Sequence, residues 1–343
     1  MSTTRLSLEQ ITANWKGNPY RNWFKVGERP LSRDPNAEFA ADRIHSDFAT
    51  LRPAKRIPLR DRKYFAIGSC FARRIEGTLR RLGGDVATLP EKLCEDHPEL
   101  FRFIEPHNLR SMMNRYNVPS MLQEVRILTG EFSPTPGWLQ YDNNDKWIDL
   151  HYCNNLQGVS EIECQQRREI LVKSMRNLFA SANTFILTLG LCEAWYDLVC
   201  GAYLNVMPPP RVSASEPTRF EHHFVGFEDN FRALEGIYES IARFMAGNEF
   251  EIVVTVSPIP LMATFTGHDI VLANCEAKSV LRAVAGEATR RYSRMTYFPA
   301  FEIVMNSNPS MAWAGDGLHV EPAMTDHVVS IFMKTLELDR NGP

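Results

Sequence analysis

The clearest hydrophobic pattern in the chain lies at residues 63–82. A run over 63–67 combines aromatic and aliphatic side chains, which predicts a buried strand. The run stops at Gly68-Ser69, and apolar residues then recur at helical spacing. These residues are Phe71, Ile75, Leu79 and Leu82. The pattern predicts a strand, a tight turn that contains Ser69, and an amphipathic helix over 71–82.

The same alternation of strand and helix patterns continues along the chain. Further strands are predicted at residues 85–89, 184–189, 250–256 and 296–303. Further helices are predicted at residues 161–180, 227–245, 274–292 and 322–338. Such alternation favours an α/β fold, a three-layer α/β/α sandwich with a mostly parallel sheet.

Two segments do not follow this alternation. Residues 1–60 mix aromatic side chains with prolines, which predicts an N-terminal arm that wraps the core through aromatic anchors. The aromatic residues are Trp15, Tyr20, Trp23 and Phe24. The segment 200–226 is rich in proline and histidine, and we expect a loop insertion of the kind that often forms a lid or binding loop. One domain over 61–338 is therefore expected beside the arm.

The charge balance limits the classes of partner. The chain of 343 residues has 38 basic and 41 acidic side chains, a formal charge of −3 that gives no support for nucleic-acid binding. No apolar run reaches transmembrane length, and the longest candidate, 252–263, is broken by Pro258 and Pro260. No signal-peptide pattern follows Met1. We expect a cytoplasmic protein without an integral membrane segment, and the sequence gives no indication of its oligomeric state.

The cysteines and histidines do not form a metal-binding pattern. The seven cysteines are scattered and include no C-x-x-C pair, so a disulfide framework or structural zinc site is not expected. His222 and His223 are adjacent, but no third ligand accompanies them in the sequence. We expect neither a metal nor a cofactor.

A serine, an aspartate and a histidine could together carry acyl-transfer chemistry. Ser69 stands at a predicted helix N-terminus, where unpaired N–H groups stabilise negative charge. Asp316 and His319 lie three residues apart, so the carboxylate can orient the imidazole. Gly190 and Ser257, like Ser69, each follow a predicted strand, and the carboxyl ends of parallel strands share one edge of a sheet. Two alternatives remain: Ser69 is only a helix cap, or Cys70 is the nucleophile.

The string Gly68-Ser69-Cys70-Phe71-Ala72 resembles the GSCFA family, a bacterial group similar to the SGNH, or GDSL-like, esterases and acyltransferases. Further segments carry the resemblance, which spans roughly 60–325: residues 188–195, 255–260, 274–282, 297–302 and 316–320. The resemblance implies an SGNH-like catalytic domain. It assigns Ser69 as nucleophile, His319 as general base and acid, and Asp316 as the orienting partner of His319.

The resemblance also identifies a departure at the oxyanion hole. SGNH enzymes have a Gly-x-Asn-Asp segment whose asparagine donates to the oxyanion, and here Gly190-Leu191-Cys192-Glu193 stands in its place. Cys192 is a poor donor. The second donor, beside the Ser69 N–H, is left open between a backbone N–H near Gly190 and the side chain of Asn108.

Other residues near the predicted site have both a functional and a structural interpretation. Glu193 could bind substrate hydroxyls or form a structural ion pair, and Trp195 could stack on a sugar ring or fill the core. Ser257 and Asn274 could line the cleft or act as cap and turn residues.

These features lead to one expected function and two alternatives. The first is a serine esterase acting on small O-acyl esters, with O-acetyl carbohydrates as a candidate substrate by analogy with SGNH enzymes. The second is a CoA-dependent O-acyltransferase of polysaccharide modification. The third is a non-catalytic module on an SGNH scaffold that binds glycans or proteins.

Overall fold

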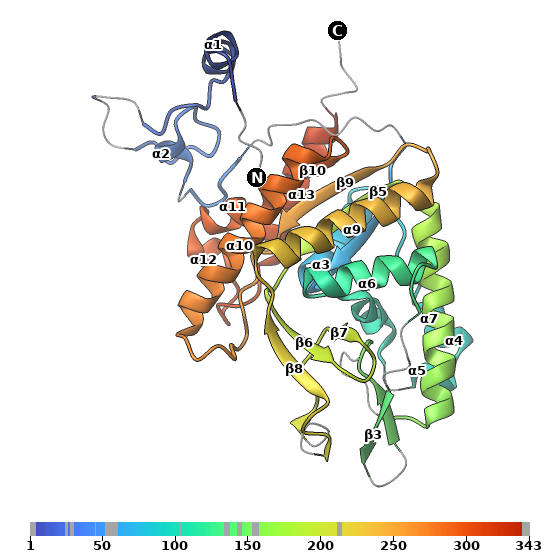
Figure 1. Cartoon of the computed structure of the whole chain (residues 1–343). Coiled ribbons are helices and arrows are strands. Elements are labelled where there is room, and N and C mark those ends of the chain that lie inside the picture. The colour runs from blue at the N-terminus through green and yellow to red at the C-terminus, as the bar shows by residue number, and fades with distance from the viewer. Residues whose placement is uncertain are drawn as a thin grey trace.

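The centre of the protein is a five-stranded parallel sheet (Figure 1). The computed structural model describes residues 5–24, 27, 31–44, 46–51, 61–102, 104–133, 138–142, 146–152, 158–210 and 215–337. The strands follow the order β10-β9-β5-β1-β2, and every neighbouring pair is parallel. Their bounds are β1 Lys63–Gly68, β2 Asp85–Val86, β5 Thr184–Leu189, β9 Glu251–Val256 and β10 Met295–Tyr297.

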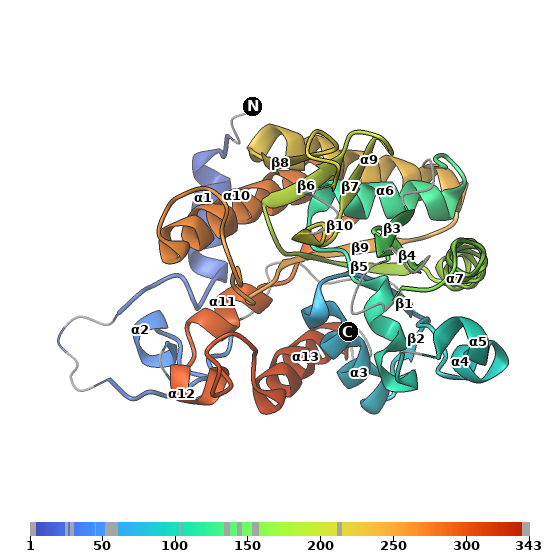
Figure 2. The same ribbon diagram turned by 90° about the horizontal axis from the view of Figure 1, so that it is seen from below.

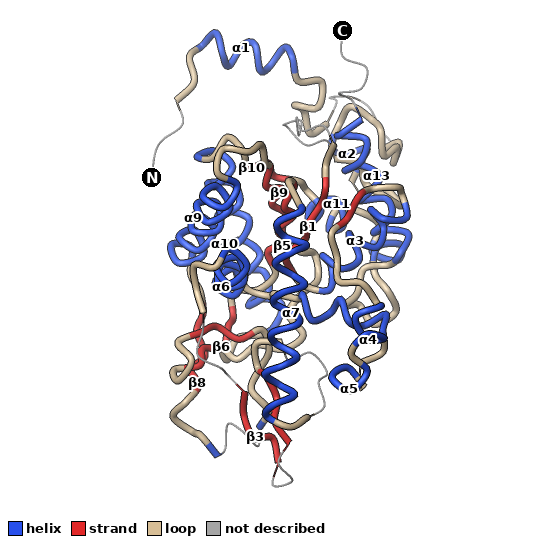
Figure 3. Tube along the Cα trace, turned by 90° about the vertical axis from the view of Figure 1, so that its right-hand side faces the viewer, coloured by secondary structure: helices blue, strands red, loops and turns tan. Residues whose placement is uncertain are grey.

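Helices cover both faces of this sheet, which confirms the predicted three-layer α/β/α fold (Figure 2). One face is covered by α6 (Val118–Thr129), α7 (Glu161–Ser181), α9 (Phe227–Met245) and α10 (Ile270–Arg291). The other face is covered by α3 (Cys70–Arg81), α11 (Ala300–Met305) and α13 (Pro322–Glu337). Figure 3 shows the two layers on opposite sides of the strands.

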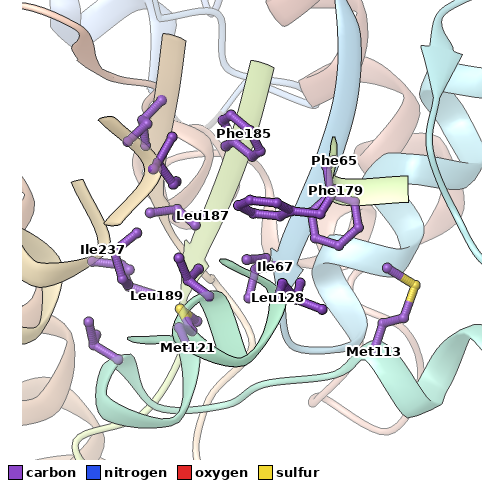
Figure 4. Packing of buried hydrophobic residues seen from close by; sticks show 14 of the residues in the cluster. Phe65, Ile67, Met113, Met121, Leu128, Phe179, Phe185, Leu187, Leu189 and Ile237 are labelled. Carbon is purple, nitrogen blue, oxygen red and sulfur yellow. The ribbon is translucent and has the colours of Figure 1, made fainter. Parts of the chain in front are cut away.

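After Lys63 at its start, strand β1 is apolar because both of its faces are buried. Tyr64 and Ala66 pack in the cluster that contains α3 and α13, whereas Phe65 and Ile67 pack in the cluster on the opposite face. In Figure 4, Phe179 of α7 lies close to Phe65, and their ring centroids are 5.4 Å apart. The strand order reverses beside β1, because β2 lies on one side of it and β5, β9 and β10 lie on the other. Ligands of open α/β sheets bind at such a reversal, outside the carboxyl ends of the strands.

The last predicted strand is wrong over most of its length. Residues 296–303 were expected to be extended, but β10 ends at Tyr297 and α11 begins at Ala300. Pro299 occupies the N-cap of α11, where its missing N–H costs no helical hydrogen bond. Strand β2 is also shorter than the predicted 85–89.

The segment 200–226 is more regular than the expected loop insertion. A three-stranded antiparallel sheet of order β7-β6-β8 uses part of it: β6 Glu193–Asp197, β7 Ala202–Leu204 and β8 Phe220–Phe224. Residues 211–214 lie outside the described part of the chain. The buried pair Arg219 and Asp197 closes this small sheet, with an Nη2–Oδ2 distance of 2.8 Å. The proline and histidine content of this segment therefore did not predict its secondary structure. Strands β7 and β8 form because each pairs with β6.

Shorter elements fill the rest of the described chain. They are α1 Leu8–Gly17, α2 Ala40–Arg43, α4 Lys92–Asp96, α5 Pro98–Phe101, a 3₁₀ helix Pro106–Met113, β3 Trp138–Asp142, β4 Lys146–Asp149 and α12 Pro309–Ala312. No helix of the described residues has the length and apolar character needed to cross a membrane.

The N-terminal arm contacts the domain near its end. Trp15, Trp23 and Phe24, expected as anchors, are each more than half exposed. The contacts are made instead by residues such as Phe48, whose ring stacks on His327 at 5.3 Å. Nearby, the Ala49 N–H donates to Ser307 Oγ. In Figure 1, α1 stands away from the sheet and its helices.

Candidate active site

Ser69 occupies the turn between β1 and α3, at the point where the strand order reverses. It is the N-cap of α3, and its hydroxyl accepts a hydrogen bond from the Phe71 N–H at 3.4 Å. Its side chain is almost fully buried. The capping role that the sequence left as an alternative is therefore present. The same cap geometry places Ser69 at the carboxyl edge of the sheet, where ligands of open α/β sheets bind.

The approach of β5 requires glycine directly before this serine. A Cβ on Gly68 would lie 1.8 Å from Thr188 Oγ1 and 2.9 Å from the Thr188 carbonyl oxygen. Gly68 and Thr188 are direct partners in the β1–β5 ladder. Because both strands are central in the sheet, neither can move aside, and the Gly-Ser turn depends on the absent side chain.

Ser257 lies beside Ser69, as the shared strand edge predicted. Its Oγ is 3.5 Å from Ser69 Oγ, and its N–H donates to the Leu189 carbonyl. Ser257 therefore extends the β9 ladder by one residue and presents a second hydroxyl to the site. Gly190 follows β5 at the same edge, where a Cβ would lie 2.7 Å from the Tyr116 carbonyl oxygen.

Asp316 and His319 form the predicted pair. Asp316 Oδ2 is 2.6 Å from His319 Nδ1, and Asp316 Oδ1 accepts from the N–H groups of Leu318 and His319 at 2.9 Å each. The hydrogen bonds from His319, first through its ring and then through its backbone, hold the pKa of Asp316 well below its usual range. An ionised Asp316 accepts the Nδ1 proton, which leaves His319 Nε2 as the basic nitrogen.

The loop that carries this pair is tied to the helix that Ser69 caps. The Arg74 guanidinium, one turn into α3, donates to the Val320 carbonyl directly after His319. The loop is closed by a bridge between Trp313 and Val320 and by a hydrogen bond from the Ala314 N–H to the His319 carbonyl. In the described part of the chain, no hydrogen bond joins His319 to Ser69. Catalytic hydrogen bonds of free enzymes are often formed only when substrate binds.

The sequence analysis missed Asn114, which lies next to the serine turn. Asn114 forms an isolated parallel bridge with Gly68, and the adjacent Arg115 N–H donates to the Gly68 carbonyl at 2.8 Å. Its amide is buried, and one end contacts the Tyr116 hydroxyl at 3.3 Å. The other end has no hydrogen-bond partner within the described residues. Because amide oxygen and nitrogen are assigned from such networks, the free end can be the NH₂ group if the Tyr116 hydroxyl donates to the oxygen.

Asn108 was the donor suggested by the sequence. Its backbone belongs to the 3₁₀ helix, but its side chain lies outside the described part of the structure. Nothing in the local sequence distinguishes Asn114 from Asn108. The bridge to Gly68 is a tertiary contact between residues 46 positions apart, so sequence spacing carries no signal for it.

Cys192 is part of the core and not of the site. It is fully buried, its Sγ contacts the Ala277 carbonyl, and burial raises its pKa to about 12. Burial likewise raises the pKa of Cys70, which disfavours the thiolate that a cysteine nucleophile needs.

Glu193, Trp195 and Asn274 secure the loop between β9 and α10. Glu193 accepts from Thr264 Oγ1 at 2.6 Å and from the Phe265 N–H at 2.8 Å. The Trp195 ring packs against Phe265 at a centroid distance of 5.3 Å. Asn274 Oδ1 accepts from the Leu261 N–H on the same loop. These contacts give the three residues a structural role in holding the loop, and their binding of a substrate stays a prediction.

The two adjacent histidines also bind neighbouring side chains. His222 Nε2 is 3.3 Å from Glu193 Oε2, and His223 Nε2 is 2.9 Å from Glu221 Oε2. Across the described ranges, no group of three or more histidine, cysteine, aspartate or glutamate side chains could hold a metal ion.

A match to a protein-family model identifies the family of this chain. Comparisons with curated proteins and with solved structures each gave no match. The model described as the GSCFA family matches residues 63–332, which includes Ser69, Asn114, Ser257 and the Asp316–His319 pair. Because this match extends over well more than half of the 343 residues, the chain belongs to the GSCFA family.

Proposed function

We propose that the protein is a serine esterase that acts on small O-acyl esters, with Ser69 as its nucleophile. The observation that supports this most is the Asp316–His319 pair, with 2.6 Å between Oδ2 and Nδ1, in a loop bound to α3 by Arg74. A serine that only caps a helix needs no such pair. General-base activation of a serine requires an oriented imidazole, and this pair supplies one in a loop attached to the helix that Ser69 caps.

The proposed reaction proceeds through an acyl-enzyme. Ser69 Oγ attacks the acyl carbonyl carbon while its proton passes to His319 Nε2, and Asp316 stabilises the imidazolium. The oxyanion accepts hydrogen bonds from the Ser69 N–H and the Asn114 amide. Asn114 thereby supplies the donor that SGNH enzymes take from the asparagine at the position of Cys192. His319 then protonates the leaving alcohol as the C–O bond breaks. Water attacks the acyl-enzyme with His319 again as base, releasing the acid and restoring Ser69.

The acyl group and the alcohol are proposed on two grounds. O-acetyl groups on a carbohydrate are the proposed substrate class by analogy with SGNH enzymes. A small acyl group is consistent with the near-complete burial of both Ser69 and Ser257.

Fluorophosphonate labelling with peptide mapping tests this proposal. We expect labelling at Ser69 in the wild type, none in Ser69→Ala, and at least a hundredfold slower labelling in His319→Ala. Ser181→Ala, at an exposed serine near the end of α7, is the matched control and should label at the wild-type rate. The rate of p-nitrophenyl acetate hydrolysis should change in the same way: wild-type in Ser181→Ala, strongly lowered in His319→Ala and absent in Ser69→Ala.

The outcomes separate the alternatives. Wild-type protein that is not labelled but binds glycans contradicts the esterase and favours a binding module. Thermal stabilisation by acetyl-CoA, with acyl transfer to a sugar hydroxyl in place of hydrolysis, favours an acyltransferase.

A further inference from the structure

Lys278 is a buried lysine that the proposed reaction does not use. It lies on α10 and is 3% exposed. Its Nζ donates to the Gly190 carbonyl and to the Ile259 carbonyl, each at 2.8 Å. Gly190 directly follows β5, and Ile259 lies two residues after Ser257. One ammonium group therefore joins two strand-end loops of the Ser69 site.

This lysine has no acidic partner among the described residues. The ionisable groups that act on its pKa are the thiols of Cys192 and Cys70. Burial raises the pKa of both thiols, so both are neutral near pH 7. Glu276 and Glu193 act on the pKa of Cys192 and are not among the groups that act on Lys278, and Glu193 is bound to Thr264 and the Phe265 backbone.

An isolated buried ammonium is costly, and a nearby negative charge reduces that cost. Burial lowers the pKa of Lys278 to about 7. Electrostatic interactions are strong in such a water-poor site, so a charge that appears during a reaction is stabilised without reorganisation of the protein. The ammonium binds the carbonyls of Gly190 and Ile259 in the loops after β5 and β9, and Ser257 in the second loop lies 3.5 Å from Ser69. The ammonium and the serine therefore lie at the same edge of the sheet.

Building on the proposed esterase function, we propose that Lys278 is a positioning residue of the Ser69 site. It fixes the loops after β5 and β9, and its positive charge favours the negatively charged adduct that forms on Ser69. The protonated form is the active one. The reaction should therefore slow as the pH rises through the range in which Lys278 loses its proton.

The pH dependence of fluorophosphonate labelling tests the role of the charge. In this reaction Ser69 Oγ forms a bond to phosphorus, the P–F bond breaks, fluoride leaves with the electron pair, and His319 takes the serine proton. Negative charge develops on the phosphoryl oxygen. We expect the wild-type rate to fall above about pH 7, by up to about tenfold per pH unit as the protonated fraction falls, until it reaches the rate of the uncharged form.

Two variants separate the charge from the hydrogen bonds. Lys278→Arg keeps a positive charge at every pH used and can donate to both carbonyls, so its rate should stay level from pH 7 to 9. Lys278→Met lacks the charge and should label at least tenfold more slowly at pH 6.5, with no fall above pH 7. Lys92→Met, at an exposed lysine of α4, is the control and should keep the wild-type profile.

Each outcome has one interpretation. A wild-type rate that does not fall between pH 7 and 9 overturns the role of Lys278 without any variant. So does a Lys278→Met rate within twofold of the wild type. Failure of wild-type Ser69 to label at any pH overturns the proposed esterase itself, and the role of Lys278 with it. The two failures are therefore distinct.

Discussion

Replacing Gly68 by alanine should destabilise the protein through a single steric conflict. The new Cβ would lie 1.8 Å from Thr188 Oγ1, and 2.9 Å from both Thr188 Cβ and the Thr188 carbonyl oxygen. Rotation of the Thr188 side chain can relieve only the first of these conflicts, because its Cβ and its carbonyl oxygen stay in place. Overpacking usually costs about 1–3 kcal/mol. Because two of the three conflicts involve atoms fixed by the β1–β5 ladder, we expect a loss of about 3 kcal/mol or more in the free energy of unfolding.

Urea denaturation measures this loss, and the chain offers a matched control. Gly77 lies within α3, and a Cβ there would meet nothing within 4 Å. Gly77→Ala should therefore stabilise by about 0.5–1 kcal/mol. Thr188→Ala removes the nearest atom. The double variant with Gly68→Ala should therefore be about 1 kcal/mol more stable than the sum of the two single effects predicts. The steric argument would be refuted if the free energy of unfolding of Gly68→Ala lay within about 0.5 kcal/mol of the wild-type value. It would also be refuted if the effects of the two substitutions simply added in the double variant.

Three further predictions concern the site. Asp316→Asn should lower kcat for p-nitrophenyl acetate about 10³–10⁴-fold with little change in KM, because His319 loses the partner that fixes its tautomer; wild-type turnover would contradict this. Asn114→Ala should lower kcat about 10²–10³-fold, as expected for one oxyanion donor; if Asn108→Ala has that effect instead, Asn108 is the donor. Urea denaturation of Lys278→Met should show a changed pH dependence of stability. Unfolded Lys278 keeps a proton that the folded state loses at about pH 7, so wild-type stability should rise relative to the variant by about 1.4 kcal/mol per pH unit from about pH 7 to 10; parallel curves would contradict the lowered pKa.

Local pattern predicted most of the central architecture. The apolar run of β1 and the helical spacing of α3 were recognised because both depend on residues adjacent in the sequence. Residues 296–303 were assigned wrongly, because their apolar character fits a strand as well as the short helix that follows Pro299. The strands β7 and β8 were missed since each is stabilised by pairing with β6 and not by its own composition.

The candidate site was only partly predictable for a related reason. Asp316 and His319 were found because the residues that interact are three positions apart. Asn114 reaches Gly68 through a long-range bridge, which no spacing rule describes. Lys278 was overlooked because lysine on a helix usually lies on the surface, and its burial depends on carbonyl groups from two distant loops.

The connection between α3 and the C-terminal segment has a consequence for a chain that ends early. All five strands of the central sheet are complete by Tyr297, whereas His319 enters 22 residues later. The His319 loop is held by Arg74, and α13 packs on α3 through contacts such as Thr78 with Asp326. A chain interrupted before Asp316 would lack both the Asp316–His319 loop and α13, so Tyr64 and Ala66 of β1 would lose part of their packing. The cover of this face of the sheet and the proposed partners of Ser69 therefore depend on the same last segment of the chain.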